Sequence, residues 1–592
     1  MSEAGPAAPA TASPAAARRS ASDRWRRLLP CLNWPRPDRA LLKGEALAGL
    51  TVGLMVIPQG VAYAALAGMP LVTGIYASLL PALVAVLFSS SVRLSVGPTA
   101  LSCLLISASL HGLAAPGSAE WVNLAVWLAL LAGAVQVALG LLRLGWFLNL
   151  VSSPVLTGFT QAAAVLIITS QLPDLLGWPG GDGLAWRPTT WNLWAAGFGL
   201  VCLGLLVLSR RWRPAFPSVL LLVLATAGLS VLLQVEQRGV AVVGVLPGGM
   251  PSLQWPVWPG WATLGQLLLP ALLITLISFL ETAASAKVDN ARQGTRWNQN
   301  QDLIGQGLAK LAAGLNGAFP TSSSFSRSAL NLYAGARSGW ATVFSVAVVA
   351  LCLQWLLPLL HHVPQAVLAA IVIVAVMGLI RPGEFLRLWR VARVEAVIAL
   401  LTFVATVLAS PQLHWGVLVG VLLALGHFLY GRLHPRIIEV GLHADGRLRD
   451  RHIWHLPALA PHTWAIRMDA ALDFGSAQAL EQAMGDHLSV HPETRRVLLF
   501  AQSINHIDAT GVETFVRLRQ QLQAQQRAWW VIGLKLPVEQ RLKAAQALQP
   551  DDHFRCIASE ADALMVLHPC GSAPLPRWPA EQRSASTREQ AP

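Results

Sequence analysis

The stretch TSSSFSRSAL at residues 321–330 places a permanent positive charge, Arg327, at the start of a short apolar run. A guanidinium inside a bilayer is costly unless it is paired or faces water, so an arginine at that depth indicates a functional site. Hydroxyl groups and free backbone N–H groups at a helix start, beside a guanidinium, form a cradle for an anion. The alternative is an arginine that reaches an interface or pairs with a structural carboxylate.

The composition around this stretch indicates a membrane protein. The chain has 592 residues, of which 54% are hydrophobic and 12% are charged, and its mean hydropathy is +0.52. Several windows exceed about eighteen nearly uncharged residues, the length that crosses a bilayer as a helix. The formal net charge of +13 does not indicate a nucleic-acid partner, because the basic residues gather in particular loops. The six cysteines lack metal-ligand spacing and predict no disulfide framework.

Apolar segments recur along the first three quarters of the chain, and we count about fourteen of them. They lie near residues 46–66, 71–88, 94–112, 121–142, 147–172, 191–208, 215–233, 263–286, 303–318, 326–336, 338–360, 363–380, 394–409 and 413–431. An even count and a basic N-terminus place both chain ends in the cytoplasm.

The distribution of charge supports this topology. The connections expected to be cytoplasmic carry Arg93, Arg143, Arg210, Arg211, Arg213, Lys287, Arg292, Arg296, Arg337, Arg381, Arg387, Arg390 and Arg393. The connections expected outside carry essentially Arg187 and Arg238, beside four acidic residues. This asymmetry predicts a multi-pass protein of the bacterial inner membrane, embedded in the lipid bilayer.

Four regions follow from these patterns. Residues 1–40 are expected to be a disordered basic N-terminal region, and residues 41–432 a helical transport domain. Short apolar runs then alternate with amphipathic stretches, which predicts a small cytoplasmic α/β domain at residues 445–568. Residues 569–592 are polar and are expected to be a disordered tail.

Polar interruptions occur at matching places in the two halves of the transport domain. IPQG at residues 57–60 breaks the first apolar segment, and SVGPT at residues 95–99 opens the third. In the second half, Glu281 interrupts the first segment and Arg327 opens the third. One such proline or glycine is more often a packing kink, but four matched interruptions predict a transporter site near the bilayer midplane.

Glu281 is the second charge expected at this depth. Its carboxyl group could take up a proton, or it could hold Na⁺ beside Thr282 and Ser285. A fixed ion pair with Arg327 or Lys310 is the structural alternative.

Several of these motifs together resemble the SulP (sulfate permease) family of anion transporters. They are GLTVGLMVIPQGVAYA at residues 49–64, GIYASLLP at 74–81, SVGP at 95–98, FLE at 279–281, FP at 319–320, SFSRS at 324–328 and VPQAVL at 363–368. The C-terminal region resembles the STAS domain that these transporters carry, so the resemblance extends over about residues 40–568.

The resemblance implies a seven-plus-seven inverted repeat, in which a core (gate) domain moves against a scaffold in an elevator mechanism, usually within a homodimer. It places the anion between the half-helix starts of the third and tenth segments. The residues carried over to that site are Gln59, Tyr63, Gly97, Pro98, Thr99, Ser324, Phe325, Ser326 and Arg327. Some animal members have an aromatic residue at the position of Thr99, which leaves selectivity open. Bacterial relatives couple transport to H⁺ or Na⁺ through the carboxylate matching Glu281, and a glutamate there leans toward protons.

The C-terminal region carries one candidate regulatory residue. IDATG at residues 507–511 resembles the loop in which anti-sigma-factor antagonists are phosphorylated, with Thr510 at the modified position. A hydroxyl at a helix start is also an ordinary N-cap, so Thr510 is expected to cap a helix or to contact a cytoplasmic protein partner unless it is phosphorylated.

The function predicted is secondary active transport of a small anion, namely sulfate, bicarbonate or a C4-dicarboxylate, by symport with H⁺ or Na⁺. An uncoupled anion channel, an exchanger and a nucleobase transporter of the same layout are the alternatives. No nucleotide-binding loop, zinc-protease motif or Cys-x-x-Cys pair occurs in the sequence, so neither an enzyme nor a cofactor is expected.

Overall fold

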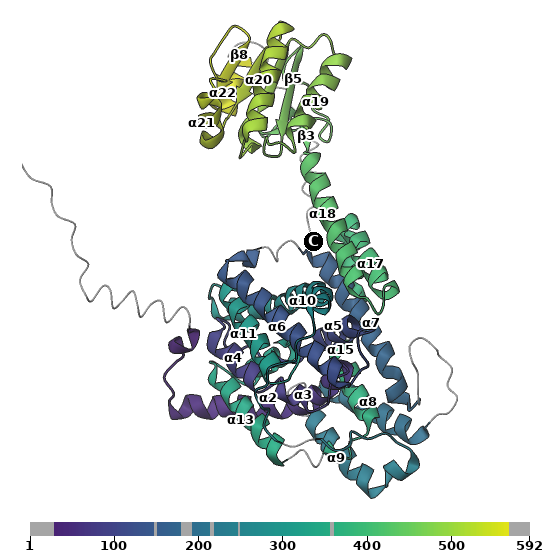
Figure 1. Ribbon diagram of the computed structural model, residues 1–592. Helices are drawn as coiled ribbons and strands as arrows, with labels where there is room; N and C mark the ends of the chain where they lie inside the picture. The colour runs from purple at the N-terminus through teal and green to yellow at the C-terminus, as the bar shows by residue number, and fades with distance from the viewer. Residues whose placement is uncertain are drawn as a thin grey trace, which may run out of the picture. The chain divides into compact units, whose positions relative to one another are not determined.

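The computed structural model describes residues 29–146, 151–178, 192–212, 218–246, 249–355 and 360–567. The expected disordered tail at residues 569–592 and most of the expected N-terminal region lie outside these residues. The chain divides into two compact units between Ala424 and Leu425, a helical unit followed by an α/β unit (Figure 1).

The helical unit confirms the predicted polytopic fold. Its helices are η1 (Pro30–Asn33), α2 (Arg39–Leu66), α3 (Thr73–Tyr76), α4 (Leu80–Phe88), α5 (Ala100–Leu110), α6 (Ala119–Leu141), α7 (Ser153–Leu176), α8 (Leu193–Trp212), α9 (Ser218–Leu232), η3 (Val235–Arg238), α10 (Trp261–Gln293), α11 (Gln299–Leu315), α12 (Phe325–Tyr333), α13 (Trp340–Trp355), α15 (Gln365–Met377), α16 (Pro382–Val391), α17 (Arg393–Leu408) and α18 (His414–Leu433). Every expected apolar segment contains a described helix, and the second is divided between α3 and α4. Within the described ranges, seven helices are long and apolar enough to cross a membrane.

The basic connection after residue 380 differs from the expected simple loop. It contains α16, a helix without a buried residue, on which Leu386, Trp389 and Val391 are exposed beside the arginines. This combination of apolar and basic side chains on an unburied helix is that of an amphipathic helix.

The helices pack in two groups. In the first group, α6 packs on α10 and α11, α4 packs on α11, and α2 packs on α13. In the second group, α7 packs on α15 and α17, and α8 packs on α15. The groups meet where α2 and α5 contact α15, α7 and α9.

Glycine permits the closest of these helix contacts. A Cβ atom on Gly133 of α6 would lie 2.8 Å from the carbonyl oxygen of Gly307 on α11. Small residues at such crossings allow two membrane helices to approach through their backbones.

The second unit is a six-stranded sheet with helices on both faces. Its strands are β3 (Ile437–Leu442), β4 (Leu448–Asp450), β5 (Thr463–Met468), β6 (Arg496–Phe500), β7 (Ala528–Ile532) and β8 (Phe554–Ile557), in the order β4-β3-β5-β6-β7-β8. Strands β5 to β8 are parallel, whereas β3 is antiparallel to both of its neighbours. The helices are α19 (Ala477–Val490), α20 (Ala509–Ala524), α21 (Leu536–Ala544) and α22 (Glu560–Leu567).

The α/β alternation is as expected, and the sheet is larger than the pattern indicated. Apolar side chains of α19, α20 and α21 share one core with one face of the sheet, and α22 covers the other face. Parallel strands buried on both faces appear as continuous apolar runs, which is why β5, β6 and β7 were visible in the sequence. Strand β3 begins at Ile437, ahead of the expected domain start at residue 445.

Candidate functional site

Two short helices begin at one point inside the first helix group. Strand β1 (Val96–Gly97) precedes α5, and strand β2 (Ser322–Ser323) precedes α12. The strands pair in antiparallel fashion, with Val96 opposite Ser323 and Gly97 opposite Ser322. Equivalent pieces of the two halves therefore meet from opposite directions, as in an inverted repeat.

The N-terminus of each short helix is capped by a hydroxyl group. Thr99 caps α5 by accepting a hydrogen bond from the backbone N–H of Ser102, and Ser324 caps α12 by accepting one from the backbone N–H of Arg327. Serine and threonine are favoured at this position because their oxygen satisfies a backbone donor that the helix leaves free. The remaining free N–H groups and the helix dipoles give both starts a partial positive charge.

Arg327 lies buried at the meeting point, with 1% of its surface exposed. Its Nε donates to Ser95 Oγ at 3.4 Å, and its Nη2 is buried without a hydrogen-bond partner. A Cβ atom on Gly97 would lie 3.2 Å from Nη2, so the guanidinium approaches the backbone of Gly97 more closely than a larger residue would allow. Among the described residues Arg327 forms no salt bridge, which argues against the structural-pair alternative.

Glu281 on α10 contacts the first half of the repeat. Thr99 Oγ1 donates to Glu281 Oε2 at 3.1 Å. Lys310 instead donates from Nζ to Gln136 Oε1 and Ser278 Oγ, both at 2.7 Å. In the part of the chain that the structure describes, Glu281 therefore has no ion pair with Lys310 or Arg327.

The hydroxyl groups near Glu281 are directed to the backbone of their own helix. Ser285 Oγ donates to the carbonyl oxygen of Glu281 at 3.1 Å, and Thr282 Oγ1 donates to that of Ser278 at 2.9 Å. Neither hydrogen bond joins these hydroxyls to the Glu281 carboxylate.

Helix α2 brings Gln59 and Tyr63 into the same group of helices, since it contacts both α5 and α12. Both side chains are buried, and Gln59 Oε1 has no hydrogen-bond partner. Phe325 differs from these residues, because 51% of its surface is exposed.

A cavity of about 270 Å³ lies between parts of the two helix groups next to these residues. Gln59 and Ser326 line it from the first group, and Arg210, on α8 of the second group, lines it from the other side. Arg210 Nη1 donates to the carbonyl oxygen of Val374 on α15. Arg210 could not be predicted as a site residue from the sequence, because it begins a run of arginines that indicates only a cytoplasmic loop.

The α/β unit corrects one expectation about Thr510. The cap of α20 is Asp508, whose Oδ1 accepts from the backbone N–H of Gly511 at 2.8 Å and whose Oδ2 accepts from that of Phe474 at 3.0 Å. Thr510 lies within the first turn of α20 with its side chain exposed. The helix begins at Ala509, so Asp508 and not Thr510 stands at the cap position, where its carboxylate accepts the backbone N–H that a cap satisfies.

Known proteins share both units. The sequence model of the sulfate permease family matches residues 42–402, and that of the STAS domain matches residues 459–563. The chain is similar to the chloroplastic sulfate transporter 4.1 of Arabidopsis thaliana, with 31% identity over 530 residues that cover 83% of this chain and 76% of the relative. It is also similar to the sodium-independent sulfate anion transporter of Bos taurus, with 28% identity that covers 91% of this chain and 92% of the relative.

A solved structure matches the same architecture. The murine solute carrier 26 family member A9, an anion transporter in the inward-facing state, aligns with a TM-score of 0.81 and 19% identity, covering 94% of this chain and 96% of that one. At this identity the match establishes the fold alone. The family model, which matches more than half of the chain, and the 31% identity to the Arabidopsis relative show that the chain belongs to the sulfate permease family, whose members are multi-pass membrane anion transporters rather than enzymes.

Proposed function

We propose that this protein is a secondary active transporter of sulfate, or of an oxyanion of similar size and charge, and that it holds the anion between the starts of α5 and α12. The observation that carries the proposal is the buried Nη2 of Arg327, which has no partner beside Gly97. A buried cationic donor without a partner is costly, and an anion within hydrogen-bond distance of it would satisfy it.

The remaining groups at this point suit an anion as well. Two helix starts direct partial positive charge to the same place, and Gln59 adds a buried amide. Sulfate is favoured over bicarbonate and C4-dicarboxylates because both relatives described above are named as sulfate transporters.

We further propose that Glu281 couples transport to a proton. Thr99 joins its carboxylate to the start of α5, so its negative charge lies close to the proposed anion. A carboxylate and an anion repel one another, whereas a protonated carboxyl group does not, so binding of H⁺ and binding of the anion favour each other.

The proton is favoured over Na⁺ for two reasons. The hydroxyls of Ser285 and Thr282 are hydrogen-bonded to backbone carbonyls of their own helix, and Na⁺ would need oxygen atoms arranged around it. The bovine relative is also named as sodium-independent. A sodium site near Glu281 is therefore the less favoured form of the proposal.

An elevator movement fits the placement of these residues. Gln59, Thr99, Glu281 and Arg327 all belong to the first helix group, and the cavity lies between parts of that group and the second. If the first group slides as a body, it carries the whole site and alternately opens it on the two sides of the membrane. Arg210, on the second group, would then attract the anion to the cavity by its charge.

We also propose an inner-membrane location with both chain ends in the cytoplasm, as the basic connections indicate. A homodimer is proposed as the working unit, with the STAS domain as a contact for a cytoplasmic protein partner. Thr510, exposed in the first turn of α20, is the proposed regulatory residue of that domain.

The test is uptake of labelled sulfate, bicarbonate and fumarate into proteoliposomes under an imposed pH gradient or an imposed Na⁺ gradient. We expect acid outside to drive sulfate uptake and the Na⁺ gradient to have no effect. Ser285→Ala serves as the matched control, because it should leave proton-driven uptake unchanged and would weaken Na⁺-driven uptake.

Other results would favour the alternatives. Downhill flux indifferent to both gradients would indicate a channel, and uptake that requires an anion on the opposite side would indicate an exchanger. Uptake of uracil in place of the three anions would indicate a nucleobase transporter and overturn the proposal.

A further inference from the structure

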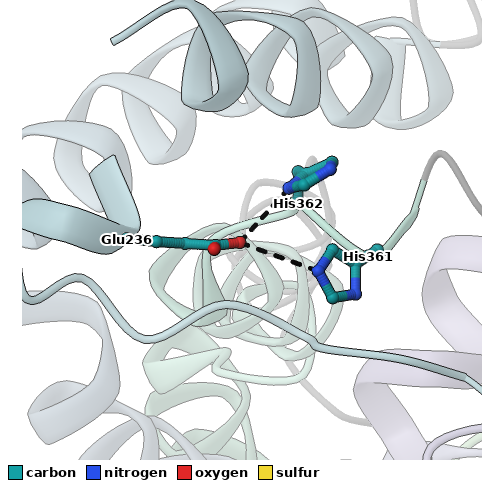
Figure 2. A group of neighbouring side chains, drawn as sticks. All are labelled: Glu236, His361 and His362. Carbon is teal, nitrogen blue, oxygen red and sulfur yellow. Dashed lines mark hydrogen bonds and ion pairs between the residues drawn. The ribbon is translucent and has the colours of Figure 1, made fainter. Parts of the chain in front are cut away.

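A cluster of three potential metal ligands lies in the second helix group, apart from the residues described above. Glu236 belongs to η3, which follows α9, and His361 and His362 lie in the turn that leads into α15. Figure 2 shows one oxygen of the Glu236 carboxylate directed toward both imidazole rings. Glu236 Oε1 lies 3.8 Å from His361 Nε2 and 3.2 Å from His362 Nδ1.

Backbone hydrogen bonds join the connection that follows η3 to the turn that carries His361 and His362, independently of the side chains. The backbone N–H of Gly244 donates to the carbonyl oxygen of His361 at 3.1 Å, and that of Val243 donates to Val363 at 2.9 Å. A third hydrogen bond, from the N–H of Gln365 to the carbonyl oxygen of Ala241, measures 2.9 Å. The ligand-bearing segments are thus positioned before any ion binds, which reduces the cost of assembling a site.

The spacing of the ligand atoms suits a small divalent ion. The three atoms, one from each side chain, all lie within 4.8 Å of one another. Zinc binds imidazole nitrogen and carboxylate oxygen at about 2.0–2.2 Å, so two ligands of a tetrahedral site stand about 3.3–3.5 Å apart. The two measured distances from Glu236 Oε1 bracket that value, and small side-chain rotations would bring all three atoms onto one ion.

The site is also accessible to water, and the nearest basic residue along the chain does not compete with a metal ion for Glu236. The exposed fractions of the Glu236, His361 and His362 side chains are 46%, 31% and 41%, so an ion can enter from water. The nearest basic residue along the chain, Arg238, has its guanidinium 4.1 Å from the ring centre of Trp194, so that its charge is directed away to another partner.

We propose that Glu236, His361 and His362 form a binding site for a divalent transition-metal ion, with Zn²⁺ as the best match. Two imidazoles and one carboxylate are a zinc donor set that leaves a fourth position for water. Ca²⁺ and Mg²⁺ are poor matches because they prefer sites built from oxygen atoms. The ion would fasten the end of α9 to the beginning of α15, two helices that contact each other in the second group.

The experiment is a zinc titration of the purified full-length protein in detergent, without a polyhistidine tag and after removal of metal. Binding is measured by competition with a fluorescent zinc indicator, and Co²⁺ serves as a second probe whose visible absorption reports tetrahedral coordination. We expect one Zn²⁺ per chain, with no competition from Ca²⁺ or Mg²⁺.

Variants of the three ligands test the assignment. Glu236→Gln, His361→Ala and His362→Ala should each weaken zinc binding by about tenfold to a hundredfold, at least the cost of removing a residue that supports a metal ligand. His111→Ala, which removes an exposed histidine elsewhere in the helical unit, is the matched control and should bind zinc as the unaltered protein does. Arg327→Ala should also bind zinc normally, which separates this site from transport.

Two outcomes would overturn the inference. Equal zinc affinity in the three ligand variants and the unaltered protein would place the ion elsewhere. No zinc binding above that of a triple variant would reduce the cluster to an ordinary ion pair between glutamate and histidine. Because Glu236 is exposed and both histidines are partly exposed, the variants should fold, and their melting temperatures without zinc check this.

Discussion

The two halves of the helical unit bring different chemistry to the same point. The first half contributes neutral groups there, namely Ser95, Gly97 and the cap residue Thr99. The second half contributes both charges, Glu281 and Arg327. Each charge is adjacent to a neutral group of the other half, since Thr99 donates to Glu281 and Arg327 donates to Ser95.

This difference shows that two repeats with the same architecture can supply different chemical groups to one site. Two copies of one charge at the meeting point would repel each other across a medium of low dielectric. With both charges in one half, the other half supplies neutral groups, namely hydroxyls, backbone and the amide of Gln59. We therefore expect changes in the second half to affect affinity and coupling strongly, and changes in the first half to adjust them.

The largest effect is expected for Arg327→Ala. Hydrogen bonds to charged groups contribute about 1.5–3 kcal/mol, and about 1.4 kcal/mol corresponds to a factor of ten. Sulfate affinity should therefore fall by about tenfold to a hundredfold or more, measured as equilibrium binding of labelled sulfate to the purified protein. Arg327→Lys should recover part of the loss, because it keeps the charge without the planar fork of donors.

The control for this change is Arg337→Ala, which removes an exposed arginine shortly after α12. It should bind sulfate normally. Full sulfate affinity in Arg327→Ala would show that Arg327 does not bind the anion, and would contradict the conclusion that the second half supplies the anion-binding charge.

The next largest effect is expected for Glu281→Gln. A pH difference of one unit supplies about 1.4 kcal/mol per proton, enough for an accumulation of about tenfold. The variant should lose this accumulation while it still binds sulfate, measured as uptake into proteoliposomes with acid outside. The double variant Gln59→Glu/Glu281→Gln moves the carboxylate to the first half. Proton coupling should stay lost in it, because Thr99 contacts position 281 and not position 59.

Recovery of proton-driven uptake in that double variant would show that the position of the carboxylate is not decisive. Unchanged coupling in Glu281→Gln alone would assign the proton to another group.

A smaller effect is expected for Gly97→Ala in the first half. The added Cβ would lie 3.2 Å from Arg327 Nη2 and 3.3 Å from Ser78 Oγ, closer than ordinary van der Waals contact. The flexible guanidinium can give way, so we expect sulfate affinity to fall several-fold with little change in melting temperature. Gly197→Ala, which meets no atom within 4 Å, is the matched control. An unchanged affinity in Gly97→Ala would place the anion away from Gly97.

The smallest effects are expected for the two caps, Thr99→Ala and Ser324→Ala. Each removes a hydroxyl cap, which costs about 1 kcal/mol of stability, so thermal unfolding should shift similarly in both variants. Only Thr99→Ala also removes a hydrogen bond to Glu281, so only this variant should shift the pH at which uptake is half-maximal. An equal pH response in both would mean that Thr99 acts as a cap alone.

Much of the site could be predicted because its residues interrupt an otherwise apolar pattern. Arg327, Glu281 and Gln59 are polar residues within apolar segments, and the resemblance of the surrounding motifs to a known family assigned them to one site. Arg210 was missed because a cation beside other cations at a helix end indicates orientation. The Glu236 cluster was missed because its members lie in two connections far apart in the chain.

The sequence by itself determined the class of protein, the positions of the membrane segments, the alternation of strands and helices in the second unit and the places where helices are interrupted. These features depend on local hydropathy and periodicity, which a bilayer and a buried sheet enforce residue by residue. Only the tertiary structure decided that Glu281 contacts Thr99 rather than Lys310, and that Arg327 lies against Ser95 and Gly97. The contacts of Arg327 depend on the pairing of β1 with β2, and the contact of Glu281 depends on the packing of α10 on α5. Both are long-range contacts that leave no periodic signal in either segment.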